Sequence, residues 1–254
     1  MPVIKEEFDT TPIAWEIYKL MYTENFKEIC VKSDKTRKYI EASFIYNGKN
    51  FDLMKFSGDT DFNFGKGWSH SIQDKYKKLI TESSISQEYK TMYSRHLGLC
   101  IELYKSVVNI SIMPRNGNLQ SAKKGIGNDR IDTFIWALDE YYSENSNLLT
   151  NNSSCEHMKI LEKYLGVFGD VYNYCGTIYH INASLVDELI ESGKKSIDSV
   201  ERMISYMNLA LRFWRQKIAY LKQKNQSEET SEISQSIRSA NNLLEKFFAR
   251  EDPV

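Results

Sequence analysis

The sequence has few residues that interrupt regular structure. Its 254 residues include only four prolines and twelve glycines, and eight of the glycines lie between Gly48 and Gly127. No glycine follows Gly193, and Pro253 is the only proline after it. Because glycine and proline are the strongest helix breakers, we expect a turn-rich middle and an uninterrupted helical C-terminal part.

Neither an excess of charge of one sign nor a long hydrophobic run is present. Lys and Arg total 33 and Asp and Glu total 34, which gives a net charge of −1. This balance argues against nucleic-acid binding over the whole surface but leaves room for a local basic patch. The apolar run around Val107 to Met113 is far shorter than the ~20 residues of a membrane helix. The first ten residues have no apolar core, so we expect no signal peptide, no membrane association and a cytoplasmic location.

Cysteine is also scarce, and neither cysteine nor histidine shows metal-site spacing. The cysteines are Cys30, Cys100, Cys155 and Cys175. The histidines are His70, His96, His157 and His180. Without a C-x-x-C pair or an H-E-x-x-H motif, no metal site is predicted and the cofactor is unknown. The cysteines are expected to be reduced and buried.

Hydrophobic spacing predicts an α+β fold that is mainly helical. Thr11-Pro12 is typical of a helix start, and the apolar residues after it predict a helix over 12–29. Alternation over 38–46, followed by Asn47-Gly48 and a return strand over 50–56, predicts an antiparallel hairpin. Further helices are expected over 70–82 and 86–104, and a strand over 107–113.

The C-terminal half has a heptad pattern. Val200, Ile204, Met207, Leu211, Trp214, Ile218 and Leu221 follow a 4-3 spacing, and so do Ile233, Ile237, Ala240, Leu244 and Phe247. The pattern predicts an antiparallel helical hairpin over 196–251 that packs on the body or forms a dimer. The polar stretch 145–154 is a candidate boundary between an α+β body, 1–145, and a helical region, 155–254, although one continuous domain is the alternative.

The segment from Pro114 to Asp132 is the first candidate site. It combines glycines and basic residues with a predicted helix start at Asn128 or Asp129, features that suit a phosphate or carboxylate. The candidate anion-binding residues are Arg115, Lys123, Lys124, Gly125, Gly127, Asn128, Arg130 and Asp132. A Walker motif and a dinucleotide-binding motif are both absent. The alternative interpretation is a capped helix start after a solvated basic loop over 114–128.

The second candidate site is the loop predicted over 57–68, with the residues just after it. Its candidate residues are Asp59, Asp61, Lys66, Trp68 and His70. Two carboxylates two residues apart are able to hold a divalent cation or act as acid and base. Capping of a turn by Asp59 is the structural alternative.

The stretch from Arg202 to Gln226 has six basic residues, interleaved aromatics and no acidic residue. This composition suits single-stranded nucleic acid or an anionic membrane surface. We favour a structural role, because Trp214 lies on the heptad seam and the acidic residues of the following helix would partly face these bases.

One segment resembles a known family. The stretch N-I-S-I-M-P-R-N-G-N-L-Q…K-K-G-I-G-N-D-R-I-D-T-F-I-W-A-L-D-E-Y-Y, from Asn109 to Tyr142, is similar to segments of hypothetical proteins of bacteria and their mobile elements. The S-G-D-T-D motif at Ser57 to Asp61 adds to the resemblance. The resemblance covers about a quarter of the chain and implies no particular activity.

Two functional hypotheses follow. In the first, the protein is an interaction protein that binds a protein partner or itself through its helical C-terminal region, as a defence or counter-defence factor of a mobile element would. In the second, it binds or acts on a phosphorylated small molecule or nucleotide. Lys123, Lys124 and Arg130 would then hold the anion, with Asp132 or Asp59 as acid–base candidate. The absence of a strong catalytic motif favours the first hypothesis.

Overall fold

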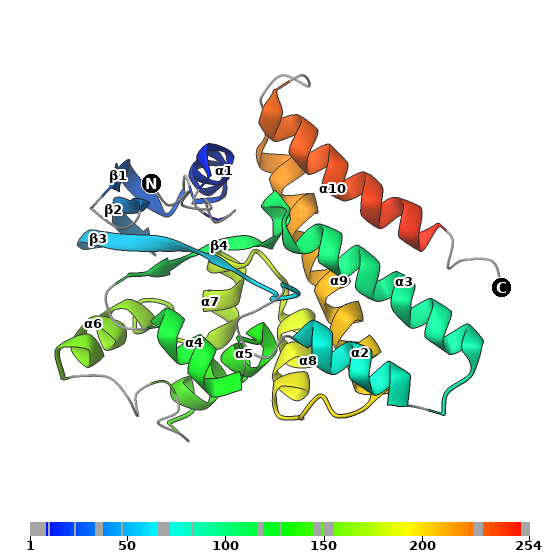
Figure 1. Ribbon diagram of the computed structural model, residues 1–254. Coiled ribbons are helices and arrows are strands. Elements are labelled where there is room, and N and C mark those ends of the chain that lie inside the picture. Colours follow the sequence, from blue (N-terminus) through cyan, green and yellow to red (C-terminus); the bar gives the residue numbers. More distant parts are fainter. Residues whose placement is uncertain are drawn as a thin grey trace, which may run out of the picture.

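The fold is α+β and mainly helical, as the sequence predicts (Figure 1). The computed structural model describes residues 9, 11–22, 24–33, 38–46, 48–65, 72–82, 84–115, 119–127, 129–144, 149, 155–225 and 231–249.

An antiparallel sheet forms in the N-terminal half. Its strands are β1 (Phe26–Ser33), β2 (Lys38–Tyr46), β3 (Lys49–Thr60) and β4 (Ile110–Pro114). They are hydrogen-bonded in the order β1-β2-β3-β4. The predicted hairpin is confirmed: β2 pairs with β3, and Gly48 between them has φ of 74°. Glycine adopts such a positive φ without steric cost, which fits its place in the turn.

Two N-terminal expectations are wrong in their boundaries. The helix predicted over 12–29 ends earlier, because α1 spans Pro12–Tyr22 and β1 begins at Phe26. There the chain pairs with β2 as a strand, although the spacing of its apolar residues is helical. The loop predicted over 57–68 begins later, because β3 continues to Thr60 and pairs there with β4.

A helix also replaces most of the loop predicted over 114–128. The residues Leu119–Gly127 form α4, and Gly125 and Gly127 lie in its last turn. The next helix, α5 (Ile131–Tyr142), has Arg130 at its N-cap, so the predicted cap at Asn128 or Asp129 is wrong. Asp129 instead has φ of 62° and forms the turn between the two helices.

In Figure 1 the remaining helices lie below the sheet and to one side of it. They are α2 (Ile72–Glu82), α3 (Gln87–Tyr104), the 3₁₀ helix η2 (Val107–Asn109), α6 (Cys155–Leu165), α7 (Val171–Ile178), α8 (Ala183–Gly193), α9 (Val200–Lys224) and α10 (Glu232–Phe248). The helices predicted over 70–82 and 86–104 correspond to α2 and α3. Of the proposed boundary 145–154, only Leu149 is described, and it is buried.

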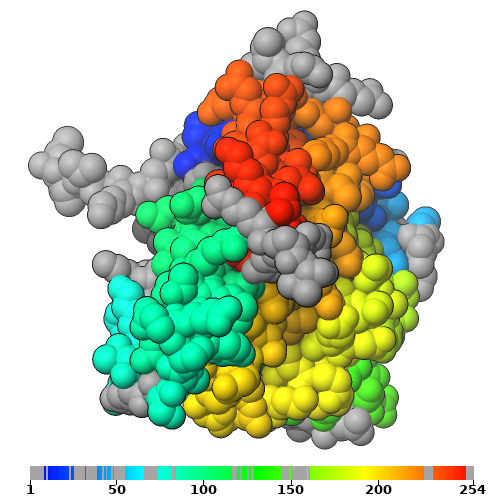
Figure 2. All heavy atoms as spheres, turned by 90° about the vertical axis from the view of Figure 1, so that its right-hand side faces the viewer, coloured from blue at the N-terminus to red at the C-terminus, as the bar shows by residue number. Residues whose placement is uncertain are grey.

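The predicted helical hairpin is α9 and α10, and its apolar seam packs on the body. Every seam residue of α9 is buried, including Trp214, and so are the α10 seam residues from Ile237 onward. In Figure 2, α10 lies across the top of one face, above α3 and beside α9. One continuous hydrophobic cluster includes residues of α1, the sheet and all the later helices.

The end of β3 sends neighbouring residues to opposite sides of the sheet. A Cβ at Gly58 would come within 2.4 Å of the Asp9 carbonyl oxygen and 2.5 Å of the Tyr18 hydroxyl, so this glycine allows α1 to approach closely. Asp59 instead meets a side chain of α4. Because side chains alternate along a strand, this close approach fixes the direction in which Asp59 points.

Candidate functional site

The two predicted sites meet at Asp59. Its carboxylate accepts a hydrogen bond from Lys123 Nζ at 2.7 Å and another from Gln120 Nε2 at 2.9 Å. Lys123 also donates to the Thr60 carbonyl oxygen and lies 3.7 Å from Asp129 Oδ1. Asn63 Nδ2 then donates to Asp129 Oδ2 at 2.9 Å. The Ser57 to Asp61 segment and the basic segment therefore share one buried polar network.

Asp61 forms a second buried ion pair, two residues along the chain. Lys217 of α9 donates to Asp61 Oδ2 at 2.5 Å, to the Ile110 carbonyl oxygen at 2.6 Å and to Ser111 Oγ at 2.8 Å. These bonds use all three ammonium protons of the lysine. Side-chain exposure is 0% for Lys217 and 1% for Asp61. The Asp-Thr-Asp segment is thus held by a lysine of α4 and a lysine of α9.

Burial acts on the pKa values of Asp61, Lys217 and Lys123 in these two ion pairs. Burial raises the pKa of Asp61 against the opposing effect of Lys217, and burial lowers the pKa of Lys217. For Lys123, burial acts to lower the pKa, but Asp59 and Asp129 outweigh it and the pKa lies above its ordinary value. A buried charge without a partner is very costly, so these lysines and aspartates stabilise one another.

Arg130 and Asp132 form a third network, between α5 and the end of α8. Arg130 Nε donates to Asp132 Oδ1 at 2.9 Å, and its Nη2 donates to Asp132 Oδ2 at 2.5 Å. The same guanidinium donates to the carbonyl oxygens of Lys195 at 3.1 Å and Ser192 at 3.3 Å. Ser192 Oγ in turn donates to Asp132 Oδ2 at 2.7 Å. The pair fixes the backbone where α8 ends.

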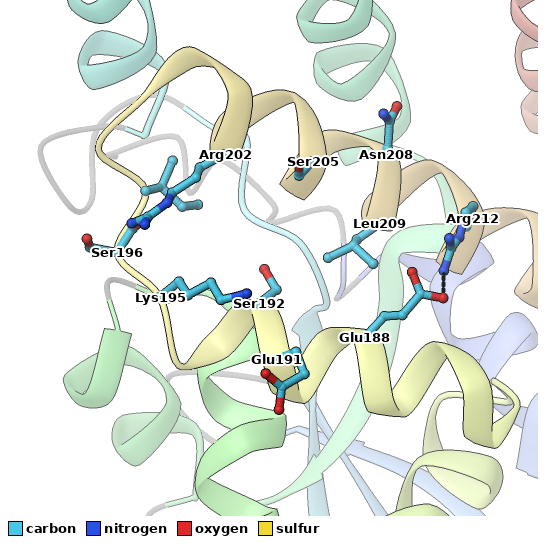
Figure 3. A pocket seen from close by; sticks show the side chains of 11 residues that line it. Glu188, Glu191, Ser192, Lys195, Ser196, Arg202, Ser205, Asn208, Leu209 and Arg212 are labelled. Atoms are coloured by element: carbon cyan, nitrogen blue, oxygen red, sulfur yellow. Dashed lines mark hydrogen bonds and ion pairs between the residues drawn. The ribbon is translucent and has the colours of Figure 1, made fainter.

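A surface pocket lies in front of this network, between α8 and α9 (Figure 3). Its volume is about 560 Å³, within the usual range of small-molecule sites. The lining residues are Glu188, Glu191, Ser192, Lys195, Ser196, Ile197, Arg202, Ser205, Asn208, Leu209 and Arg212. In Figure 3, Lys195 extends into the space between the helices, and Leu209 points into it from α9. Ser192 therefore belongs both to the pocket and to the Asp132 network.

The other predicted site residues lie apart from the pocket lining. Arg115 stacks on the Tyr39 ring with its guanidinium carbon 5.0 Å from the ring centroid, on the sheet. Lys124 is half-buried in α4. Lys66, Trp68, His70 and Asn128 lie outside the described residues. Of the cysteines, Cys100 and Cys175 are free and buried, as expected.

The basic stretch after Arg202 finds its partners mostly outside α10. Arg202 pairs with Asp198, Arg212 with Glu188, and Lys224 with Glu24. Of the acidic residues expected to face these bases, Glu228, Glu229 and Glu251 lie outside the described residues, so this expectation stays a prediction. Arg215 does contact α10, but by stacking on the Phe248 ring at 5.2 Å.

The pocket between α8 and α9 was missed at the sequence level. The available signal is the spacing of Arg202, Ser205, Leu209 and Arg212, which places them on one side of α9, away from its heptad seam. Nothing in the sequence indicates that α8 and the 193–199 connection lie opposite that side.

No protein-family model, curated protein or solved structure matches this chain. Within the described residues, no three or more His, Cys, Asp or Glu side chains gather as metal ligands would. Every helix in that same part of the chain is too short or too polar to cross a bilayer. The function is therefore inferred from the side chains of the site alone.

Proposed function

We propose that this protein binds a small anionic molecule in the pocket between α8 and α9. The observation that carries the proposal is a pocket of about 560 Å³ whose lining has three cations, Lys195, Arg202 and Arg212, beside two carboxylates, Glu188 and Glu191. Ser192, Ser196 and Ser205 lie in the same lining, but their hydroxyl protons are already donated to Asp132, Asp198 and the Glu201 carbonyl oxygen. The ammonium and guanidinium groups therefore carry the proposal, since cations bind phosphate and carboxylate oxygens through charge-assisted hydrogen bonds.

The cations of the pocket are able to replace their present carboxylate partners by a ligand anion with little loss of stability. Arg202 and Arg212 form ion pairs whose side chains are all 44% exposed or more. Such exposed pairs contribute only about 0–1 kcal/mol, so a ligand anion is able to replace the carboxylate. Lys194, and to a lesser degree Lys195, lowers the pKa of Glu191, and the ion pair of Glu191 is with Lys194 at 2.6 Å. Lys123 and Arg130 differ from these residues, because buried carboxylates already hold their charges.

Burial of the hairpin seam favours the second hypothesis from the sequence over the first. The apolar seam of α9 and α10 is buried. Among the residues that the structure describes, Tyr172 is the one large apolar side chain that is exposed. An apolar hairpin face for a protein partner is therefore not offered there, and partner binding stays a prediction. Anion binding is favoured, with the α8–α9 pocket in place of the 114–132 segment as the binding site.

Ligand binding is testable by thermal shift and calorimetry with phosphate, pyrophosphate, citrate and a set of phosphate monoesters. A ligand at a hundred times its Kd stabilises the protein by about 2.7 kcal/mol. We expect stabilisation by at least one anion, and its loss in the Lys195→Ala/Arg202→Ala variant. The control is Lys222→Ala, which removes an exposed lysine of α9 outside the pocket. Binding that survives in the double variant, or no binding by any anion, would contradict the proposal.

A further inference from the structure

We infer that the ligand is a nucleoside phosphate, bound along α9 with its phosphate at the end formed by Lys195 and Arg202. This inference rests on the proposed anion site and names the class of molecule that fills it. It follows from the different chemistry of the two ends of the pocket and of the surface between them.

The first end carries two cations, Lys195 and Arg202. Figure 3 shows them at the connection that leads from α8 into α9. Arg202 also pairs with Asp198, at an exposed position where a ligand anion is able to compete. A phosphate group accepts hydrogen bonds from ammonium and guanidinium groups, and Arg and Lys are its usual partners. This end is the place for the phosphate.

The opposite end presents a donor beside an acceptor. Arg212 and Glu188 form an ion pair there, drawn as the dashed line in Figure 3. Arg202 and Arg212 are ten positions apart on α9, which corresponds to about 15 Å along a helix. A single phosphate at the first end would not reach this pair. A ligand that uses both ends is elongated and has hydrogen-bonding groups far from its phosphate.

Leu209 of α9 points into the middle of the pocket and is 7% exposed. Ile197 lies beside Ser196 in the connection, at the first end. An apolar side chain between the two ends suits a planar base better than a sugar alone. Arginine, asparagine and glutamate side chains are also the groups that read base edges by hydrogen bonds. Glu188 and Arg212 supply two of these groups here, whereas the Asn208 side chain points away from α8 in Figure 3.

The cationic end is fixed from behind by the buried pair of Arg130 and Asp132. Arg130 holds the carbonyl oxygens of Ser192 and Lys195, and Ser192 donates its hydroxyl proton to Asp132. The Ser192 oxygen is thereby held in one orientation at the pocket floor. A site held in place before binding loses less conformational freedom when the ligand arrives. Arg130 and Asp132, which the sequence predicts to hold an anion, are thus positioning residues for the pocket.

Calorimetry with inorganic phosphate, ribose 5-phosphate and the four ribonucleoside 5′-monophosphates tests the inference. We expect at least one nucleotide to bind tenfold or more tightly than ribose 5-phosphate, since the base adds contacts at Leu209 and the far end. Equal affinity for ribose 5-phosphate and every nucleotide would overturn the inference and leave the proposed function standing. Absence of binding by all these phosphates and by citrate would overturn both.

Variants at the two ends separate the phosphate contacts from the base contacts. Lys195→Ala should lower the affinity for ribose 5-phosphate and for the nucleotide alike, by about tenfold. Glu188→Gln should lower nucleotide affinity or change the preferred base, with ribose 5-phosphate binding unchanged. Lys222→Ala is the matched control and should change neither. A Glu188→Gln protein that binds every nucleotide as the wild type does would overturn the assignment of the base end.

Discussion

At the residue scale, Lys123 and Lys217 are buried, whereas a basic segment in the sequence predicts lysines that are exposed to solvent. Lys123 and Lys217 are 1% and 0% exposed and each meets an aspartate of the Asp-Thr-Asp segment. The sequence marks these residues as charged but does not show that their charges are already neutralised. Their partners lie 64 and 156 positions away, so no local pattern reveals the pairing.

His180 is the residue whose charge state depends most clearly on folding. It has a positive φ of 56°, and its ring stacks on Tyr220 with the centroids 3.7 Å apart. Burial, together with Lys217 and Lys224, lowers the pKa of His180 from 6.5 to about 3. The folded protein therefore holds this imidazole neutral in weak acid, whereas the unfolded chain protonates it below its ordinary pKa.

This difference predicts a loss of stability on acidification. Since the pKa of His180 is depressed in the folded state, the unfolded state binds the extra proton between about pH 6.5 and pH 3. From pH 7 to pH 5 the free energy of unfolding should fall by about 2 kcal/mol from this group. Urea unfolding at pH 7 and at pH 5 measures this change in the free energy of unfolding. His180→Asn keeps a residue that tolerates positive φ and should remove that part of the pH dependence. An unchanged dependence in the variant would show that the imidazole is not the cause.

At the element scale, the hairpin was predictable and β1 and α4 were not. Alternation over 38–46 and the Asn47-Gly48 turn act locally, so the sequence alone indicates them. Strand β1 depends on pairing with β2, while its apolar residues continue the helical spacing of α1. In α4, the glycines indicate a loop, yet Leu119, Ala122 and Ile126 are spaced as one helical face and pack against the core.

The contact between α5 and α8 depends on Gly193. A Cβ there would lie 2.2 Å from the Asp132 carbonyl oxygen and 2.9 Å from Trp136 Cβ. Gly193→Ala should therefore destabilise the protein by about 1–3 kcal/mol or more through overpacking. Gly98 in α3 is the matched control, because a Cβ there meets nothing within 4 Å. Gly98→Ala should stabilise the protein by about 0.5–1 kcal/mol. Equal effects of the two substitutions in urea unfolding would contradict this account of the α5–α8 contact.

At the scale of the whole molecule, the general architecture was predictable and the pocket was not. Composition and periodicity indicate an α+β fold that is mainly helical, because burial patterns repeat within each element. The pocket requires Ser192 and Lys195 to lie opposite Arg202 and Arg212, which depends on how α8 packs beside α9. The charges of Arg130 and Asp132 indicate anion binding in the sequence, but Arg130 donates to the backbone of Ser192 and Lys195, and Asp132 accepts from the Ser192 hydroxyl.

The continuous core predicts cooperative unfolding. One hydrophobic cluster contains Trp15 of α1, Phe134 of α5 and Trp214 of α9, on both sides of the 145–154 stretch. We therefore expect one transition in urea, with tryptophan fluorescence and far-UV circular dichroism giving the same midpoint. Two separated transitions would instead show that the 1–145 and 155–254 parts fold independently.

The pairing of Asp61 with Lys217 also constrains how the chain is made. The two residues are 156 positions apart, and Glu24 pairs with Lys224 at a separation of 200. At synthesis rates of about 5–20 residues per second, the aspartate waits roughly 8–30 s on the ribosome before its lysine is translated. During that interval the carboxylate lacks its buried partner. We therefore expect the segment around Asp61, just after β3, to reach its final packing only when α9 has left the exit tunnel.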